Sequence, residues 1–88
     1  MNKFRGYVRY FQQYATEYNF DYLMLAAQGY QESMLGQDRV SPRGAVGVMQ
    51  VLPQYAAADP ISIRNVRDAQ NNIHAGTKML AQIHQDLL

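Results

Sequence analysis

The sequence predicts an all-α domain, because its apolar residues recur at helical spacing in stretches that turn-forming residues separate. With 88 residues, the chain is long enough for one domain with a thin hydrophobic core. It contains neither an internal repeat nor a low-complexity stretch, so nothing in it indicates a second unit.

The first predicted helix spans residues 4–18. One face of it carries apolar residues at alternating steps of four and three: Phe4, Val8, Phe11, Ala15 and Tyr18. Asn19 can adopt the left-handed conformation that ends a helix. The tyrosines of this helix are expected to be partly buried packing residues.

The second predicted helix spans residues 22–35, capped by Asp21 and ended by Gly36. It has two apolar sides. One is a stripe of Leu23, Ala26, Ala27, Tyr30 and Met34, and Glu32 points nearly opposite, beside Leu25 and Gln28.

Two further helices are predicted beyond an ordered loop over residues 36–47, in which Ser41-Pro42, Gly44 and Gly47 favour tight turns. A brief third helix is expected over residues 53–59, because proline is tolerated in a first helical turn. The fourth covers residues 69–87, with Asp68 as its cap and a stripe of Ala69, Ile73, Gly76, Leu80, Ile83 and Leu87. Gly76 in this stripe predicts the close approach of another helix.

The composition excludes several classes of function. The net charge is +1 without a basic run, so no nucleic-acid partner is expected. The absence of cysteine excludes disulfides, thiolate zinc sites and cysteine nucleophiles. His74 and His84 lie ten residues apart, not at the one-turn spacing of a two-histidine metal site, and no metal or cofactor is expected. No apolar stretch reaches the roughly 18 residues that a membrane span needs.

Glu32 is the clearest candidate for a functional residue in this sequence. Between Asp21 and Asp38 it is the only ionisable group apart from tyrosines. A helix with two apolar sides is largely enclosed, which places Glu32 either deep in the protein or on the wall of a cleft. Such surroundings suit a general acid. The alternative is that Glu32, one turn from the helix end, simply faces solvent.

Three linked motifs carry a resemblance to a known family. The strings AAQGYQES, SPRGAVGVMQVLP and NNIHAGTKML are similar, in order and spacing, to the motif series of the soluble-type (SLT) lytic transglycosylases and the related goose-type lysozymes. Residues 11–59 most resemble the catalytic domain of the membrane-bound F branch of that family. The resemblance implies a lysozyme-like helical fold, peptidoglycan glycan strands as the partner, and a periplasmic location with membrane attachment through regions outside this chain.

The resemblance also implies roles for five residues. Glu32 corresponds to the catalytic acid and base, and Ser33, which follows it in the family's Glu-Ser pair, is expected to contact substrate. The family's Gly-Leu-Met-Gln motif corresponds to residues 47–50, with Val48 in place of leucine. By this correspondence Gln50 hydrogen-bonds substrate, Met49 packs near the cleft, and Ser41 gives a polar loop contact. The alternatives are that Ser33 only bonds a helix carbonyl, Met49 is core, and Ser41 only begins a turn.

The number of carboxylates separates two mechanisms. Glycosidases usually use two, and Asp38 is the only nearby second candidate, although its position favours a plain loop residue. The resemblance implies one carboxylate: Glu32 protonates the oxygen between MurNAc and GlcNAc, then deprotonates the C6 hydroxyl, which closes a 1,6-anhydro ring. The alternatives are an inactive peptidoglycan-binding fragment or a lysozyme-type hydrolase.

Two departures from the family's pattern concern the extent of the domain. The family has an Ala-Tyr-Asn motif on a later helix, which this chain does not reach, and tends to have tyrosine where Met79 stands. Residues 1–88 are therefore expected to form the N-terminal part of a single, incomplete catalytic domain, truncated before its C-terminal helices. A partly bare face around Leu25, Met49 and Leu52 would then favour self-association.

Overall fold

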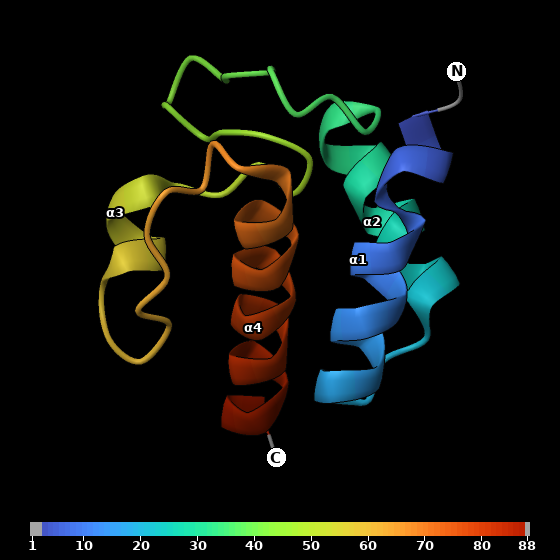
Figure 1. The fold of residues 1–88 in the computed structure, drawn as a ribbon. Helices are drawn as coiled ribbons and strands as arrows, with labels where there is room; N and C mark the ends of the chain where they lie inside the picture. Colours follow the sequence, from blue (N-terminus) through green and yellow to red (C-terminus); the bar gives the residue numbers. More distant parts are fainter. Residues whose placement is uncertain (1–2, 88) are drawn as a thin grey trace.

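The computed structural model describes residues 3–87, and the side chains of residues 6–83. Four helices make up the domain: α1 (Lys3–Tyr18), α2 (Tyr22–Ser33), α3 (Pro53–Ala57) and α4 (Ala69–Leu87). In Figure 1, α1 runs beside α4, α2 packs against α1 in the opposite direction, and α3 flanks α4. Within the described residues, extended pairing is limited to isolated bridges from Val46 to Val40 and to Val51. The predicted all-α class is confirmed.

Local capping residues fix the junction between α1 and α2. Asn19 has a φ of 65°, and the N–H of Phe20 donates to the carbonyl of Ala15 at 2.8 Å. Asp21 then accepts from the N–H of Leu23 at 2.8 Å through Oδ1. These contacts confirm the left-handed end of α1 and the aspartate cap of α2.

The end of α2 differs from the prediction. The helix stops at Ser33, and the next two residues, Met34 and Leu35, are left-handed with φ of 54° and 60°. Gly36, the expected terminator, has no positive φ. Its N–H donates to the Ser33 carbonyl and hydroxyl, both at 3.1 Å. The Ser33 hydroxyl also donates to the carbonyl of Val48 at 2.6 Å, a tertiary contact made where the helix ends, about one turn before the glycine.

The buried side of α2 also differs from the prediction. Much of the expected stripe is exposed, at Leu23, Ala27, Tyr30 and Met34. The core side consists of Leu25, Ala26, Gly29 and Ser33. A Cβ at Gly29 would lie 3.1 Å from Val48 and 3.2 Å from Phe11, so the missing side chain lets α2 approach the core closely. A count of apolar side chains gives no weight to glycine and serine, which is why it selected the wrong face.

The fourth helix begins as predicted. Asp68 accepts from the N–H of Asn71 at 3.0 Å through its side chain, and from that of Asn72 at 2.8 Å through its carbonyl. The partner of Gly76 is not the helix that the stripe predicted. A Cβ at Gly76 would lie 2.5 Å from Cβ of Met49, so the glycine admits the segment between the bridge residues Val46 and Val51. The predicted contributions of Phe4 and Leu87 lie outside the described side chains.

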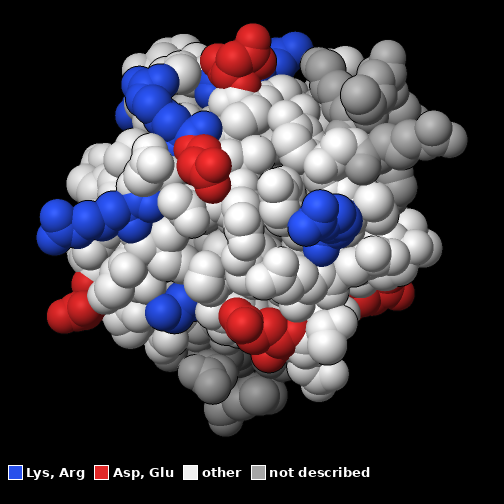
Figure 2. Space-filling model, viewed as in Figure 1, with Lys and Arg blue, Asp and Glu red and all other residues white. Residues whose placement is uncertain are grey.

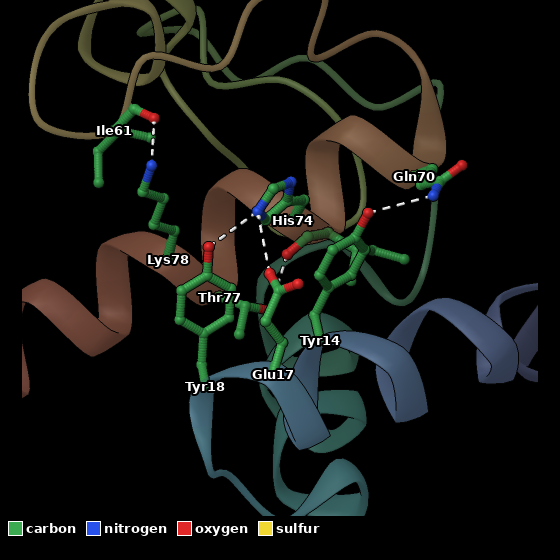
Figure 3. Close-up of polar contacts among 9 residues, drawn as sticks. Tyr14, Glu17, Tyr18, Ile61, Gln70, His74, Thr77 and Lys78 are labelled. Atoms are coloured by element: carbon green, nitrogen blue, oxygen red, sulfur yellow. Dashed lines mark hydrogen bonds and ion pairs between the residues drawn. The ribbon is translucent and has the colours of Figure 1, made fainter.

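A polar cluster joins α1 to α4 (Figure 3). The ring of His74 stacks on Tyr14, with centroids 4.3 Å apart and planes inclined by 7°. Its Nε2 shares a 2.8 Å hydrogen bond with the Tyr18 hydroxyl and lies 3.6 Å from Glu17. Burial lowers the pKa of His74; the charge of Glu17 opposes this and that of Lys78 adds to it. The prediction that tyrosines of α1 are packing residues is confirmed for Tyr14 and Tyr18.

The molecular surface is weakly charged. In Figure 2, basic and acidic side chains are scattered over the visible face, with wide uncharged areas between them. The prediction of a partly bare apolar face around Leu25, Met49 and Leu52 is wrong. Leu25 and Met49 are 1% and 7% exposed, and Leu52 is half-buried. The exposed large apolar side chains are instead Leu23, Met24, Tyr30, Met34, Val40, Tyr55 and Ile83. Self-association stays a prediction. In the described part of the chain, no helix combines the length and apolarity needed to cross a membrane.

Candidate active site

Glu32 borders an open pocket where the end of α2, the segment 46–51 and the second half of α4 meet. The pocket has a volume of about 190 Å³. Its lining is mainly apolar, with two amide side chains and one acid: Gln28, Glu32, Met49, Gln50, Val51, Gly76, Met79, Leu80 and Ile83. Glu32 is the only charged side chain among these lining residues.

The carboxylate of Glu32 is exposed to solvent on the pocket wall. The expectation of a largely enclosed helix is therefore wrong, because α2 buries only its other side. Gln28, one turn earlier, donates through Nε2 to Oε1 of Glu32 at 3.3 Å. This bond uses one of the lone-pair sites of the carboxylate, so the other sites can accept from a ligand.

Met49 and Gln50 reach the pocket from a tight turn. Gly47 and Gln50 have φ of 80° and 50°, and the flanking residues Val46 and Val51 pair through hydrogen bonds of 2.9 and 3.0 Å. Met49 is 7% exposed and packs on Gly76. Met49 thus lines the pocket and also belongs to the hydrophobic core, so the two interpretations drawn from the sequence, a residue near the cleft and a core residue, both apply.

The side chain of Gln50 has a defined orientation. Its Nε2 donates to the carbonyl of Gly47 at 2.9 Å and to that of Arg39 at 3.2 Å. Both amide hydrogens are therefore committed to the protein backbone. The side-chain oxygen Oε1 is the atom left to accept a hydrogen bond from a ligand.

Ser33 lies inside the protein and not among the pocket-lining residues. It is 3% exposed, and its hydroxyl lies 2.6 Å from the carbonyl of Val48, to which it donates, and 3.1 Å from that of Gly29. It also accepts from the N–H of Gly36 at 3.1 Å. Ser33 therefore connects the end of α2 to the turn that carries Met49, a long-range role beyond the helix-carbonyl bond that was the alternative to a substrate contact.

Ser41 and Asp38 also lie away from the pocket lining. Ser41 closes a turn, because its hydroxyl accepts from the N–H of Ala45 at 3.0 Å and its carbonyl accepts from that of Gly44 at 2.9 Å. Asp38 is exposed. The pKa of Tyr7 on α1 is raised mainly by the burial of the Tyr7 side chain and, to a smaller extent, by the negative charge of Asp38. Of the predicted site residues, the structure brings together Glu32, Met49 and Gln50.

Sequence reasoning placed Gln28 beside Glu32 without giving it a role, and it missed Gln37 and Asn72. Gln28 shares the pocket with Glu32, while Gln37 and Asn72 hold the turn behind it. The signal for Asn72 was its position four residues before Gly76, which puts a polar residue on the buried face of α4. Among the residues that the structure describes, His, Asp and Glu side chains form no group of three that could hold a metal ion.

These features define a small all-α domain whose pocket presents a single carboxylate, the kind of group that general acid–base catalysis uses. A sequence profile of the family described as the Transglycosylase SLT domain matches residues 9–88. The chain belongs to this family.

Several curated relatives carry the name membrane-bound lytic murein transglycosylase F. The chain is 36% identical over 83 residues to that of Marinobacter nauticus, covering 94% of the chain and 16% of the relative. It is 38% identical over 74 residues to that of Actinobacillus succinogenes, covering 84% and 14%. It is 32% identical over 81 residues to that of Ectopseudomonas mendocina, covering 92% and 16%. The chain thus spans about one sixth of the length of these relatives.

Proposed function

We propose that this domain is a peptidoglycan lytic transglycosylase that cleaves the bond between MurNAc and GlcNAc and leaves a 1,6-anhydro-MurNAc end. The observation that carries the proposal is the position of Glu32, the one charged side chain on the wall of an open, mainly apolar pocket. Membership of the Transglycosylase SLT domain family supports it, as do the names of the relatives, which specify murein.

Glu32 serves in this proposal as both acid and base. As an acid it protonates the glycosidic oxygen, so that the GlcNAc hydroxyl leaves while the N-acetyl oxygen of MurNAc bonds to C1. As a carboxylate it then removes the proton of the C6 hydroxyl. The C6 oxygen bonds to C1 and displaces the N-acetyl oxygen, which closes the anhydro ring and returns the proton to Glu32.

The neighbours of Glu32 suit these two steps. Gln28 donates to Oε1 of Glu32 through its amide and so orients the carboxylate on the pocket wall. Gln50 offers Oε1 to a substrate N–H or hydroxyl, because its own amide hydrogens are committed to carbonyls. A sugar seated against Met49 and Leu80 would cover the exposed carboxyl and exclude water from it, which strengthens the electrostatic interactions of the site.

A one-carboxylate mechanism fits the position of Asp38. That residue is not among the pocket-lining residues, and its charge acts on Tyr7 of α1. Ser33 and Ser41 are not included as substrate contacts, because their hydroxyls bond to backbone groups. We infer a periplasmic location, where peptidoglycan lies, with membrane attachment through regions outside this chain. That residues 1–88 form only part of the catalytic domain stays a prediction.

The products distinguish the proposed reaction from its alternatives. Purified peptidoglycan is digested with the protein, and the released muropeptides are analysed by mass spectrometry. The proposal predicts 1,6-anhydro-MurNAc ends, which are lighter than reducing ends by one water. Reducing ends alone would show a lysozyme-type hydrolase, and binding without release would show a non-catalytic peptidoglycan-binding domain.

A further inference from the structure

The segment 46–51, which carries Met49 and Gln50 to the pocket, depends on residues outside it. It is not part of a helix or a ladder of strands, and two of its residues, Gly47 and Gln50, have left-handed backbone. Such a conformation is not favoured locally for a residue like glutamine. Hydrogen bonds from the surrounding structure must therefore hold the segment in place.

Every backbone N–H of this segment has an acceptor. Those of residues 46, 47, 50 and 51 donate to main-chain carbonyls. The remaining two use side-chain amides: the N–H of Val48 donates to Oε1 of Gln37 at 3.0 Å, and that of Met49 donates to Oδ1 of Asn72 at 2.8 Å. The central residues of the turn are thus fixed by two side chains from other parts of the chain.

Asn72 makes the larger set of these contacts. It is 0% exposed, and its Nδ2 donates to the carbonyls of Val46 at 2.7 Å and Val66 at 2.9 Å. Together with the bond from Met49, these contacts use both donors and the acceptor oxygen of the amide. One buried side chain therefore joins α4, the loop before it and both sides of the turn.

Gly47 leaves the space that the two amides need. A Cβ at this position would lie 2.7 Å from Cγ of Asn72 and 2.7 Å from Oε1 of Gln37. Any larger residue would push both amides away from the turn, in addition to straining a φ of 80°. Gln37, Gly47 and Asn72 therefore fit together as one support.

We propose that Asn72, assisted by Gln37, is a positioning residue that fixes Met49 and Gln50 on the pocket that Glu32 borders. This inference rests on the proposed function of Glu32. Asn72 does not line the pocket and acts through the backbone of the turn. A displacement of this turn by about 1 Å would misplace Gln50 relative to Glu32, and displacements of that size can cost about 100-fold in rate.

Asn72→Asp is the direct test, because it keeps the shape of the side chain and the acceptor for Met49. It removes both Nδ2 donors and sets a carboxylate oxygen against the carbonyls of Val46 and Val66. We expect peptidoglycan turnover at saturating substrate to fall about 10- to 100-fold at a temperature where circular dichroism shows the variant folded. The ¹H–¹⁵N resonances of Met49 and Gln50 should shift, and the Met49 N–H should exchange faster with solvent.

Two controls separate positioning from general stability. Asn71→Asp makes the same chemical change at the neighbouring position, where the amide donates to the Asn65 carbonyl at 3.3 Å and not to the turn. Thr77→Val alters a residue that is also 0% exposed, but whose hydroxyl donates within α4, to the carbonyl of Ile73. Both controls should leave turnover and the Met49 resonance close to those of the unmodified protein.

If Asn72→Asp does not fold, Gln37→Glu provides the same comparison at a half-buried site. It keeps the acceptor for Val48 and removes the bonds to the carbonyls of Val66 and Arg67. The inference would be overturned if the test variant lost no more turnover than Thr77→Val and its Met49 and Gln50 resonances did not shift. If the unmodified protein releases no product, the proposed function fails, and the resonances alone then decide whether Asn72 positions the turn.

Discussion

Replacing Gly76 with alanine should destabilise the domain, although helix propensity alone predicts the opposite. Alanine is favoured over glycine inside a helix by about 1 kcal/mol. The added methyl group would, however, lie 2.5 Å from Cβ and 2.7 Å from Cγ of Met49, where ordinary carbon contacts are about 3.5–4.0 Å. The backbone of Met49 is held by Asn72, so rotating the side chain cannot relieve the contact with Cβ.

The two effects have different magnitudes. Overpacking costs about 1–3 kcal/mol, and a clash next to the backbone belongs at the upper end of that range. Subtracting the propensity gain leaves a net loss of about 2 kcal/mol in the free energy of unfolding. For a domain of this size, that loss lowers Tm by about 8–16 °C.

Gly6→Ala is the matched control. Gly6 is also inside a helix, α1, but a Cβ there has nothing within 4 Å. This variant should gain about 0.5–1 kcal/mol from propensity alone, with Tm higher by a few degrees. Thermal unfolding followed by circular dichroism at 222 nm measures both. An equal rise in Tm for Gly76→Ala and Gly6→Ala would contradict the close contact between Met49 and α4 at Gly76.

Two further predictions concern buried polar groups. Because burial lowers the pKa of His74, the unfolded chain binds a proton there more readily than the folded protein. The contribution of His74 to stability is therefore complete above the ordinary pKa of 6.5 and is lost as pH falls from that value through the lowered pKa of the folded state. Urea unfolding between pH 8 and 5.5 should show this loss in the unmodified protein and a smaller one in His74→Phe; equal slopes would contradict it. Ser33→Ala removes the hydroxyl donor of the Val48 carbonyl and leaves the Gly36 N–H with the Ser33 carbonyl as its acceptor, and should cost about 1–3 kcal/mol in urea unfolding. A change below about 0.5 kcal/mol would show that these bonds do not hold the end of α2.

Much of the fold could be predicted because its boundaries depend on local contacts. Asn19, Asp21 and Asp68 act on residues within four positions of themselves, and their effects are visible in the sequence. The end of α2 could not be predicted in this way. It depends on the bond from Ser33 to Val48, fifteen residues later, which a local pattern does not contain.

In the candidate site, too, some residues could be predicted from the sequence and those that act through long-range contacts could not. Family resemblance identified Glu32, Met49 and Gln50, and the structure brings these three to one pocket. It did not identify Gln37 and Asn72, whose contacts with the turn span 11 and 23 residues. Their side-chain amides bond to backbone atoms, which every residue type has. The residues that they contact therefore carry no side-chain feature from which the contact could be predicted.

Comparing Glu32→Gln with Asp38→Asn tests whether Glu32 alone acts as both acid and base. Both changes replace a carboxylate by an amide of nearly the same shape, at exposed positions inside and outside the pocket lining. Release of muropeptides from purified peptidoglycan should fall by at least about 10²- to 10⁴-fold in Glu32→Gln, while binding to the peptidoglycan is retained. Asp38→Asn should remain within a few-fold of the unmodified protein. Comparable losses in the two variants, or retained turnover in Glu32→Gln, would contradict the one-carboxylate account.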